Sequence, residues 1–285
     1  MLTTTISNNI LTVEIKNLGA ELCSLRDKNN KQYIWEGNAQ YWPKHSPILF
    51  PIVGTLKNNI YHYNDVSYTM SRHGFAREME FKLIDHQVNK AIFSLHSSEE
   101  TMKTYPFKFE LQIIYTLFDN SLNIEYKVVN TGDSLMPFSI GAHPAIALAD
   151  VFENYSLEFE KDEALQQHTL ENDLISTVTK VINLKDNQLD LSYDLFKNDA
   201  LIFKSLTSRS LTILENQKPL LKLNFDKFPS LGIWTKINAP FICIEPWFGY
   251  SDTINSTGDL FHKEGIQILN HDEVFYSKFS IEILD

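Results

Sequence analysis

The sequence has few cysteines, no cluster of basic residues and no long apolar run. Its only two cysteines, Cys23 and Cys243, lie far apart in apolar, strand-like surroundings. This number and spacing predict neither a disulfide framework nor a zinc site, so we expect two buried free thiols in a reducing compartment. No stretch approaches the roughly 18 apolar residues of a membrane span, and residues 1–10 lack the basic and apolar regions of a secretory signal. We therefore expect a cytoplasmic protein with no membrane partner.

The charge balance excludes another class of partner. Among 285 residues there are 25 Lys and Arg against 36 Asp and Glu, a formal net charge of -11. Nucleic acids and anionic membrane surfaces are bound through clustered Lys and Arg, which this chain lacks. With 43% hydrophobic residues the chain can bury a large core. Because no linker, low-complexity tract or internal repeat marks a boundary, we expect a single domain over residues 1–285.

Alternation of apolar and polar residues with period two predicts an all-β, antiparallel fold. Two hairpins stand out: residues 60–63 and 66–70 flank Asn64-Asp65, and residues 109–117 and 122–129 flank Asp119-Asn120. The remaining expected strands are residues 11–15, 21–25, 32–35, 48–53, 81–85, 91–95, 137–141, 200–203, 211–214, 221–225, 231–234, 240–245 and 273–283. Helix is the exception: Ser97 to Glu100 has the spacing of a capping box for one short helix. Residues 151–197 look polar and less regular, and their acidic run 158–163 is typical of a solvated face.

Three stretches have the composition of a site. In the first, residues 72–77, the imidazole of His73 stands between Arg72 and Arg77 on a connection between strands. Binding and catalytic groups are often found on such connections, although a lone loop histidine is more often an ordinary surface residue. In the second, Pro144 restricts His143 to extended backbone at the end of an apolar strand. His143 is there either a site residue or a core residue bonded to backbone.

The third stretch is residues 240–249, in which Glu245 ends a continuous apolar strand. Burying an unpaired carboxylate is costly, so Glu245 must be paired, protonated or used in chemistry, and we favour a function. Together with His73 and His143, this carboxylate could bind a metal or act as acid and base. The histidines form no local pair as in H-E-x-x-H, and no Ser or Cys lies in a G-x-S-x-G context. Acid–base work on a polar substrate is the chemistry that remains.

These stretches resemble the aldose 1-epimerase (galactose mutarotase-like) family, in the branch that includes LacX-type proteins. The resemblance covers nearly the whole chain, and its most specific motifs are residues 73–77 (HGFAR), 141–144 (GAHP) and 245–249 (EPWFG). It implies one large antiparallel β-sandwich with the sugar bound across an open cleft, and it implies no cofactor and no metal.

The resemblance also implies roles for individual residues. The position of Glu245 corresponds to the catalytic base and that of His143 to the general acid, while His73 orients the sugar and assists at its ring oxygen. We expect the opposite charges of Glu245 and His143 to favour the ionised carboxylate and the protonated imidazole. Trp234 and Trp247 correspond to sugar-contact positions.

Two further positions depend on the same resemblance. Asp199 corresponds to a sugar-contact position, although from its place before a strand alone it is equally well a turn residue. Many relatives have a Gly-Arg pair where this chain has Gly54-Thr55. The missing cation is then to be supplied by Arg72, Arg77 or Lys57.

The expected function is interconversion of the α and β anomers of a hexose by a monomer or homodimer. One alternative is a hexose-6-phosphate 1-epimerase, with Arg72, Arg77, Lys57 and Lys236 available for a cationic subsite. A second is a sugar-binding or sensor protein without catalysis on the same fold. A glycosidase is disfavoured because no second carboxylate occurs in a comparable motif.

Overall fold

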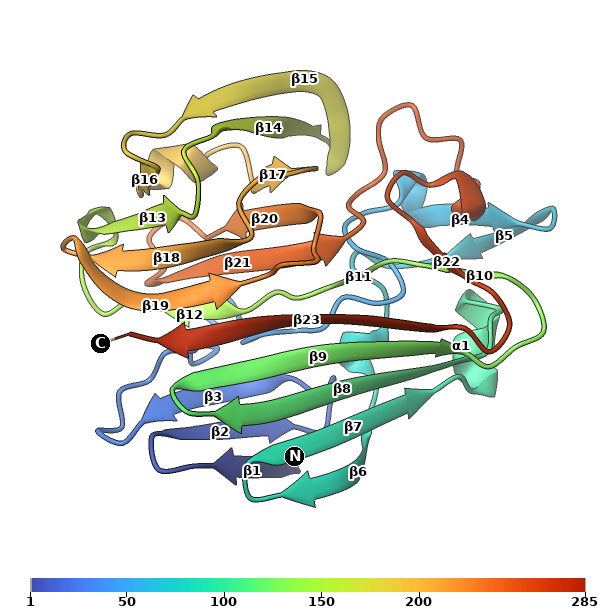
Figure 1. Cartoon of the computed structure of the whole chain (residues 1–285). Helices are drawn as coiled ribbons and strands as arrows, with labels where there is room; N and C mark the ends of the chain where they lie inside the picture. Colours follow the sequence, from blue (N-terminus) through green and yellow to red (C-terminus); the bar gives the residue numbers. More distant parts are fainter. Residues whose placement is uncertain (1, 285) are drawn as a thin grey trace.

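The computed structural model describes residues 2–284, and its sheets are antiparallel throughout, which confirms the predicted all-β class (Figure 1). The largest sheet has nine strands in the order β16 (Gln188–Asp190), β13 (Tyr155–Phe159), β18 (Ser210–Glu215), β19 (Lys218–Asn224), β23 (Val274–Ile283), β9 (Ser121–Asn130), β8 (Phe109–Phe118), β7 (Lys90–His96) and β6 (Lys82–Gln87). The second sheet has the order β11 (Ile140–Gly141), β21 (Phe241–Phe248), β20 (Ser230–Trp234), β17 (Leu201–Phe203), β14 (Ala164–Glu171) and β15 (Leu174–Asn183), with β12 (Ala145–Ala147) also paired to β21.

Smaller sheets and short helices complete the described part of the chain. The small sheets are β1 (Thr3–Ser7), β2 (Leu11–Lys16) and β3 (Leu22–Asp27); β4 (Ile60–Tyr63) and β5 (Val66–Thr69); and β10 (Met136–Phe138) and β22 (Gln267–Leu269). The helices are α1 (Glu99–Thr104) and the single-turn η1 (Lys57–Asn59), η2 (Ala76–Glu78), η3 (Phe152–Asn154), η4 (Tyr193–Phe196) and η5 (Leu260–His262). None of the helices in residues 2–284 is long and apolar enough to cross a membrane.

The main hydrophobic core is shared by the two large sheets and the small sheet of β1, β2 and β3. One buried cluster includes Leu111 and Ile113 from β8 and Ile242 and Ile244 from β21, and its members come from strands along most of the chain. The alternate residues of β21 point away from this core. Phe241, Cys243 and Trp247 belong to two smaller buried clusters on the other face of the sheet, because successive side chains of a strand point to opposite faces. That second face of β20 and β21 carries the candidate site.

Several local predictions are confirmed by the structure. The two predicted hairpins are β4–β5 and β8–β9. Asn64, Asp65 and Asp119 in their turns have positive φ angles of 49°, 60° and 48°, the conformation that Asn and Asp tolerate best.

Other local predictions are wrong. Residues 32–35 and 48–53 are mostly buried but form only isolated bridges rather than strands. Their short apolar runs fit any buried segment, extended or not. The stretch 137–146 is divided among β10, β11 and β12. Cys23 is only partly buried, whereas Cys243 is fully buried.

The helix start and the polar region also differ from expectation. The capping box lies one residue later than predicted, because Ser98 is the N-cap of α1 and Thr101 completes the box. Residues 151–197, expected to be irregular, contain the long hairpin β14–β15 at the top of Figure 1. The acidic run is only partly solvated, since Glu163 accepts hydrogen bonds from the backbone N–H groups of Thr207 and Ser208.

Candidate active site

Strand register places His143 directly opposite Glu245. On β21, Trp247 pairs with Gly141 and Cys243 pairs with Ala145, so the same antiparallel register continues through position 143. Backbone hydrogen bonds from Ala142 to Pro246 and from Ile244 to Pro144 keep this register between the two pairs. Opposite residues of antiparallel strands lie on the same face. Glu245 therefore lies in the middle of β21, not at its end as predicted.

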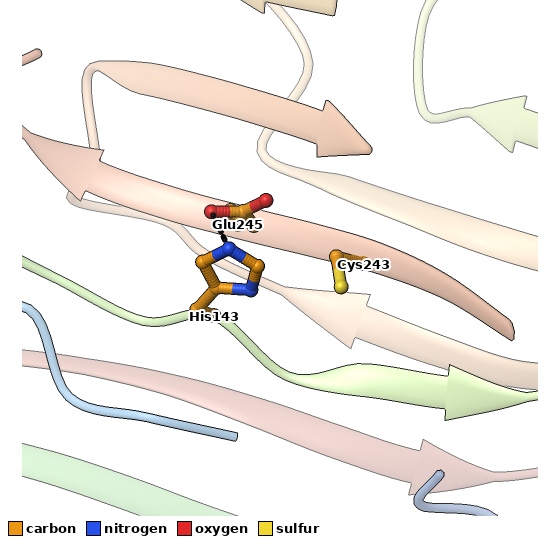
Figure 2. Close-up of side chains that lie close together, drawn as sticks. All are labelled: His143, Cys243 and Glu245. Atoms are coloured by element: carbon orange, nitrogen blue, oxygen red, sulfur yellow. Dashed lines mark ion pairs between the residues drawn. The ribbon is translucent and has the colours of Figure 1, made fainter. Parts of the chain in front are cut away.

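The imidazole and the carboxylate are in contact. His143 Nε2 lies 3.2 Å from Glu245 Oε2, and both side chains are almost fully buried (Figure 2). The ring of His73 stands edge-on to that of His143, with 5.7 Å between ring centroids. The three predicted catalytic residues thus meet on one cavity of about 400 Å³, a size suited to a single small molecule. The cavity is lined by Trp42, Gly54, Arg72, His73, Arg77, His143, Asp199, Ala200, Ile202, Trp234, Glu245, Trp247 and Ser251.

Burial shifts the pKa values of Glu245 and His143 in the direction opposite to our expectation. Removal from water raises the pKa of Glu245 well above its usual value, an effect that the Arg72 charge opposes and that of Asp199 reinforces. Burial also lowers the pKa of His143 to about 3. Burial therefore favours the uncharged carboxylic acid and imidazole over the expected ion pair. Moving one proton across the 3.2 Å contact converts one form into the other without changing the net charge.

His73 is fixed as a neutral group on its loop. Its backbone is left-handed (φ 69°), and its N–H donates to the carbonyl of Gly54. Gly54 N donates in return to His73 Nδ1 at 3.1 Å, and Arg72 Nε lies 3.2 Å from His73 Nε2. Burial lowers the pKa of His73 well below its usual value, and the charges of His143, Arg72 and Arg77 reinforce this. A neutral imidazole has one lone pair and one N–H, so only one of these two nitrogens accepts, and the other can donate a hydrogen bond to a sugar oxygen.

Glycines make room for the indole of Trp247. A Cβ at Gly232, the β20 partner of Glu245, would lie 2.3 Å from the Trp247 ring, and one at Gly141 would lie 2.5 Å from it. The indole therefore lies against the backbones of both neighbouring strands. Trp234, two residues after Gly232 on β20, also lines the cavity, and its ring stands edge-on to His143 with 5.9 Å between ring centroids.

Trp42 is a site residue that the sequence analysis did not assign. Its ring stacks on His143 with 4.9 Å between centroids and a 27° angle between planes. Trp42 lies in a loop between Tyr41 and Pro47, and nothing in this local sequence indicates a partner about 100 residues away.

The arginines of the site already have acidic neighbours. Arg72 Nη1 lies 3.4 Å from Asp173, in the β14–β15 turn, and 3.9 Å from Asp199. Arg77 donates to the carbonyl of Arg72, and its Nε lies 3.6 Å from Glu78. The sequence analysis did not assign Asp173 to the site, because residues 151–197 showed only a polar and less regular pattern.

The two lysines considered for the site lie elsewhere. Lys57 Nζ donates to the backbone carbonyls of Ile254 and Ser256, and Lys236 Nζ donates to that of Tyr41. Neither lines the cavity.

Comparison with known proteins agrees with this architecture. The model of the aldose 1-epimerase family matches residues 2–266. The chromosomal LacX protein of Lactococcus lactis subsp. lactis is 37% identical over 268 residues, 89% of this chain and 90% of LacX. The structure of a galactose mutarotase related enzyme from Lactobacillus acidophilus superposes with a TM-score of 0.95 at 32% identity, covering 100% of this chain and 98% of that one. A galactose mutarotase-like protein from Lactobacillus casei gives a TM-score of 0.92 at 30% identity, covering 99% and 100%.

The chain therefore belongs to the aldose 1-epimerase family and has the galactose mutarotase-like fold. This membership confirms the resemblance inferred from the HGFAR, GAHP and EPWFG motifs.

Proposed function

We propose that the protein interconverts the α and β anomers of a hexose, with Glu245 and His143 moving the two protons. The observation that carries the proposal is the buried contact between these side chains, 3.2 Å apart on a cavity lined by tryptophans and polar groups. Aromatic rings suit the apolar face of a pyranose, and the polar groups suit its hydroxyls. The name of the Lactobacillus acidophilus relative, a galactose mutarotase related enzyme, agrees with a sugar substrate.

Anomer exchange needs one proton removed from the C1 hydroxyl and one delivered to the ring oxygen. The pair first passes into its charged form by moving one proton from Glu245 to His143. Glu245 then takes the C1 hydroxyl proton as His143 delivers one to the ring oxygen, and the C1–O5 bond breaks to give the open-chain aldehyde. Rotation about C1–C2 presents the other carbonyl face, and the same transfers in reverse close the ring. After ring opening Glu245 carries a proton and His143 is neutral, which is the form that burial favours. Burial thus stabilises the protonation state that accompanies the opened sugar.

A free hexose is favoured over a hexose 6-phosphate. A phosphate dianion is bound best by arginines or lysines without other anionic neighbours. Arg72 and Arg77 line the cavity but lie within 4 Å of Asp173, Asp199 or Glu78. Lys57 and Lys236 are engaged with backbone carbonyls away from the cavity.

Polarimetry on a panel of freshly dissolved α-anomers tests this proposal. We expect catalysed mutarotation of at least one free aldohexose, and a lower kcat/KM for the corresponding 6-phosphate. A preference for the phosphorylated sugar would overturn the substrate assignment and leave the acid–base pair in place. Binding of sugars without any acceleration over the spontaneous rate would instead favour the non-catalytic sugar-binding protein.

A further inference from the structure

Three donor groups of different chemistry meet beside the cavity: an imidazole, a thiol and a carboxylate. Cys243 precedes Glu245 by two positions on β21, so both side chains point to the same face of the sheet. The shared register with β11 and β12 places His143 against them. One ligand atom from each of the three residues lies within 4.8 Å of the other two. Figure 2 shows the imidazole beside both of the other side chains.

The spacing is close to that of a metal site. Three atoms no more than 4.8 Å apart always lie within about 2.8 Å of a common centre, whereas zinc needs about 2.0–2.3 Å to N, O and S ligands. Each donor would have to move inward by no more than about 0.5 to 0.8 Å, which small side-chain rotations can supply. The mixed sulfur, nitrogen and oxygen set suits a thiophilic ion such as Zn²⁺, whereas Mg²⁺ and Ca²⁺ prefer oxygen ligands.

Unpaired polar atoms provide an independent indication of a missing ligand. Within residues 2–284, His143 Nδ1 is buried without a hydrogen-bond partner, and the only close polar contact given for Glu245 Oε2 is the one with His143 Nε2 at 3.2 Å; the two residues are 7% and 2% exposed. Buried polar atoms are normally satisfied, so such exceptions need an explanation. A bound sugar accounts for groups that face the cavity, and a metal ion held between these side chains would engage the carboxylate and one nitrogen of the imidazole.

Charge balance favours a divalent ion at this place. When it binds, the thiol of Cys243 loses its proton, the His143–Glu245 pair loses the one that it shares, and both pass to solvent. A thiolate, a carboxylate and a neutral imidazole then neutralise the two positive charges, so no net charge is left in the buried site. The cavity side stays open for a water molecule as fourth ligand.

We propose that His143, Cys243 and Glu245 form a binding site for a thiophilic divalent cation of the Zn²⁺ type, and that this ion excludes the sugar and inhibits the protein. The exclusion follows because the ion engages both groups that would otherwise exchange protons with the substrate. The binding site itself is independent of the catalytic proposal, whereas the inhibition rests on it.

Equilibrium dialysis of tag-free, chelator-treated protein against Zn²⁺ alone tests the site. We expect one strong site per chain in the wild type, weakened at least tenfold in Cys243→Ala, which removes the sulfur without burying a hydroxyl. Cys23→Ala is the matched control and should bind like the wild type, because the Cys23 thiol donates to the Glu14 carbonyl on β2, away from the cavity. Equal affinity in wild type and Cys243→Ala would overturn the site, as would equally strong binding of Mg²⁺.

Cobalt substitution gives a readout that does not depend on activity. Co²⁺ should give a thiolate-to-metal charge-transfer band in wild type and Cys23→Ala but not in Cys243→Ala. Circular dichroism on the same samples establishes that Cys243→Ala is folded. A Co²⁺ spectrum without thiolate character in the folded wild type would refute the assignment of Cys243 as a ligand.

Inhibition is then measured by anomer exchange. Zn²⁺ should raise the apparent KM for the sugar in wild type and Cys23→Ala, and have at least tenfold less effect on Cys243→Ala. If the wild type catalyses no exchange, the proposed function fails. The metal site is then still tested by Zn²⁺ binding, and the competition between metal and sugar by the loss of the Co²⁺ band when sugar is added. If exchange occurs but Zn²⁺ neither binds nor inhibits, the metal inference fails alone.

Discussion

Replacing Glu245 by Gln should greatly reduce activity and at the same time stabilise the protein at neutral pH. The amide keeps the shape of the side chain and one accepting oxygen, so sugar affinity should change little. Its inability to take the C1 proton should lower kcat by roughly 10² to 10⁴, which is about 2.7 to 5.5 kcal/mol of transition-state stabilisation. Comparing kcat and KM by polarimetry separates loss of the base from loss of binding.

The stability effect follows from the raised pKa. Because burial raises the pKa of Glu245 in the folded state above its value in the unfolded chain, the unfolded state ionises first as the pH rises. The wild type therefore loses stability as the pH rises from the pKa of Glu245 in the unfolded chain to its pKa in the folded protein. Gln cannot ionise, so the variant lacks this loss, and the difference in unfolding free energy should grow as the pH rises above the pKa of Glu245 in the unfolded chain. Urea denaturation across this pH range measures it.

Two results would refute this reasoning. One is a Glu245→Gln variant that exchanges anomers as fast as the wild type. The other is a variant that is less stable than the wild type by the same amount at every pH. Glu100→Gln is the matched control, because the Glu100 side chain is 73% exposed on α1 and does not line the cavity. It should alter neither kcat nor the pH dependence of stability.

Three further predictions follow from the site geometry. For metal-free protein, a plot of kcat against pH should have a broad plateau. The value of kcat should fall at low pH as the His143–Glu245 pair gains a second proton near His143's pKa of about 3, and at high pH as the pair loses its last proton. A fall in kcat on the acid side near pH 6.5 would contradict this. Trp42→Leu removes the ring stacked on His143, so it should hydrate the imidazole and raise the pKa of His143 toward its ordinary value. An NMR titration measures this pKa, and an unchanged value would show that Trp42 does not influence it. Gly232→Ala should displace the Trp247 indole, lower the unfolding free energy by about 1–3 kcal/mol in thermal unfolding and weaken sugar binding. Gly132→Ala is the control and should be milder, because the nearest atom to its added Cβ would be 3.3 Å away. Equal effects of the two substitutions would refute the close-contact account.

Local structure was predicted best where neighbouring residues in the sequence determine the conformation. The β4–β5 and β8–β9 hairpins combine alternating strands with Asn or Asp residues in the turns, so pattern and turn residues agree. Residues 48–53 form no strand because a short apolar run reports burial without reporting conformation. The β14–β15 hairpin was missed because β15 is an edge strand with many exposed residues, so it lacks a clear apolar face.

The three candidate catalytic residues could be named from the sequence, but their contacts could not. The resemblance to the family singled out His73, His143 and Glu245, whereas the 3.2 Å contact depends on a register between segments about 100 residues apart. The pKa directions depend on burial by residues from several strands and loops. For this reason the expected ion pair was wrong even though its two members were identified.

Cys243 illustrates the same limit. The sequence offered no nearby second cysteine or histidine pair, so no metal site was predicted. The ligand set that we now propose spans two segments of the chain and exists only because they pair in one sheet.

The central claim is that this cavity catalyses anomer exchange, and NMR exchange spectroscopy on an equilibrated hexose tests it most directly. Saturating the α-anomeric proton signal should reduce the β signal of the wild-type sample in proportion to protein concentration. A sample containing Glu245→Gln should show only residual transfer. Transfer no faster than the spontaneous rate with wild-type protein, under conditions where line broadening proves that the sugar is bound, would contradict the account and leave a sugar-binding protein in its place.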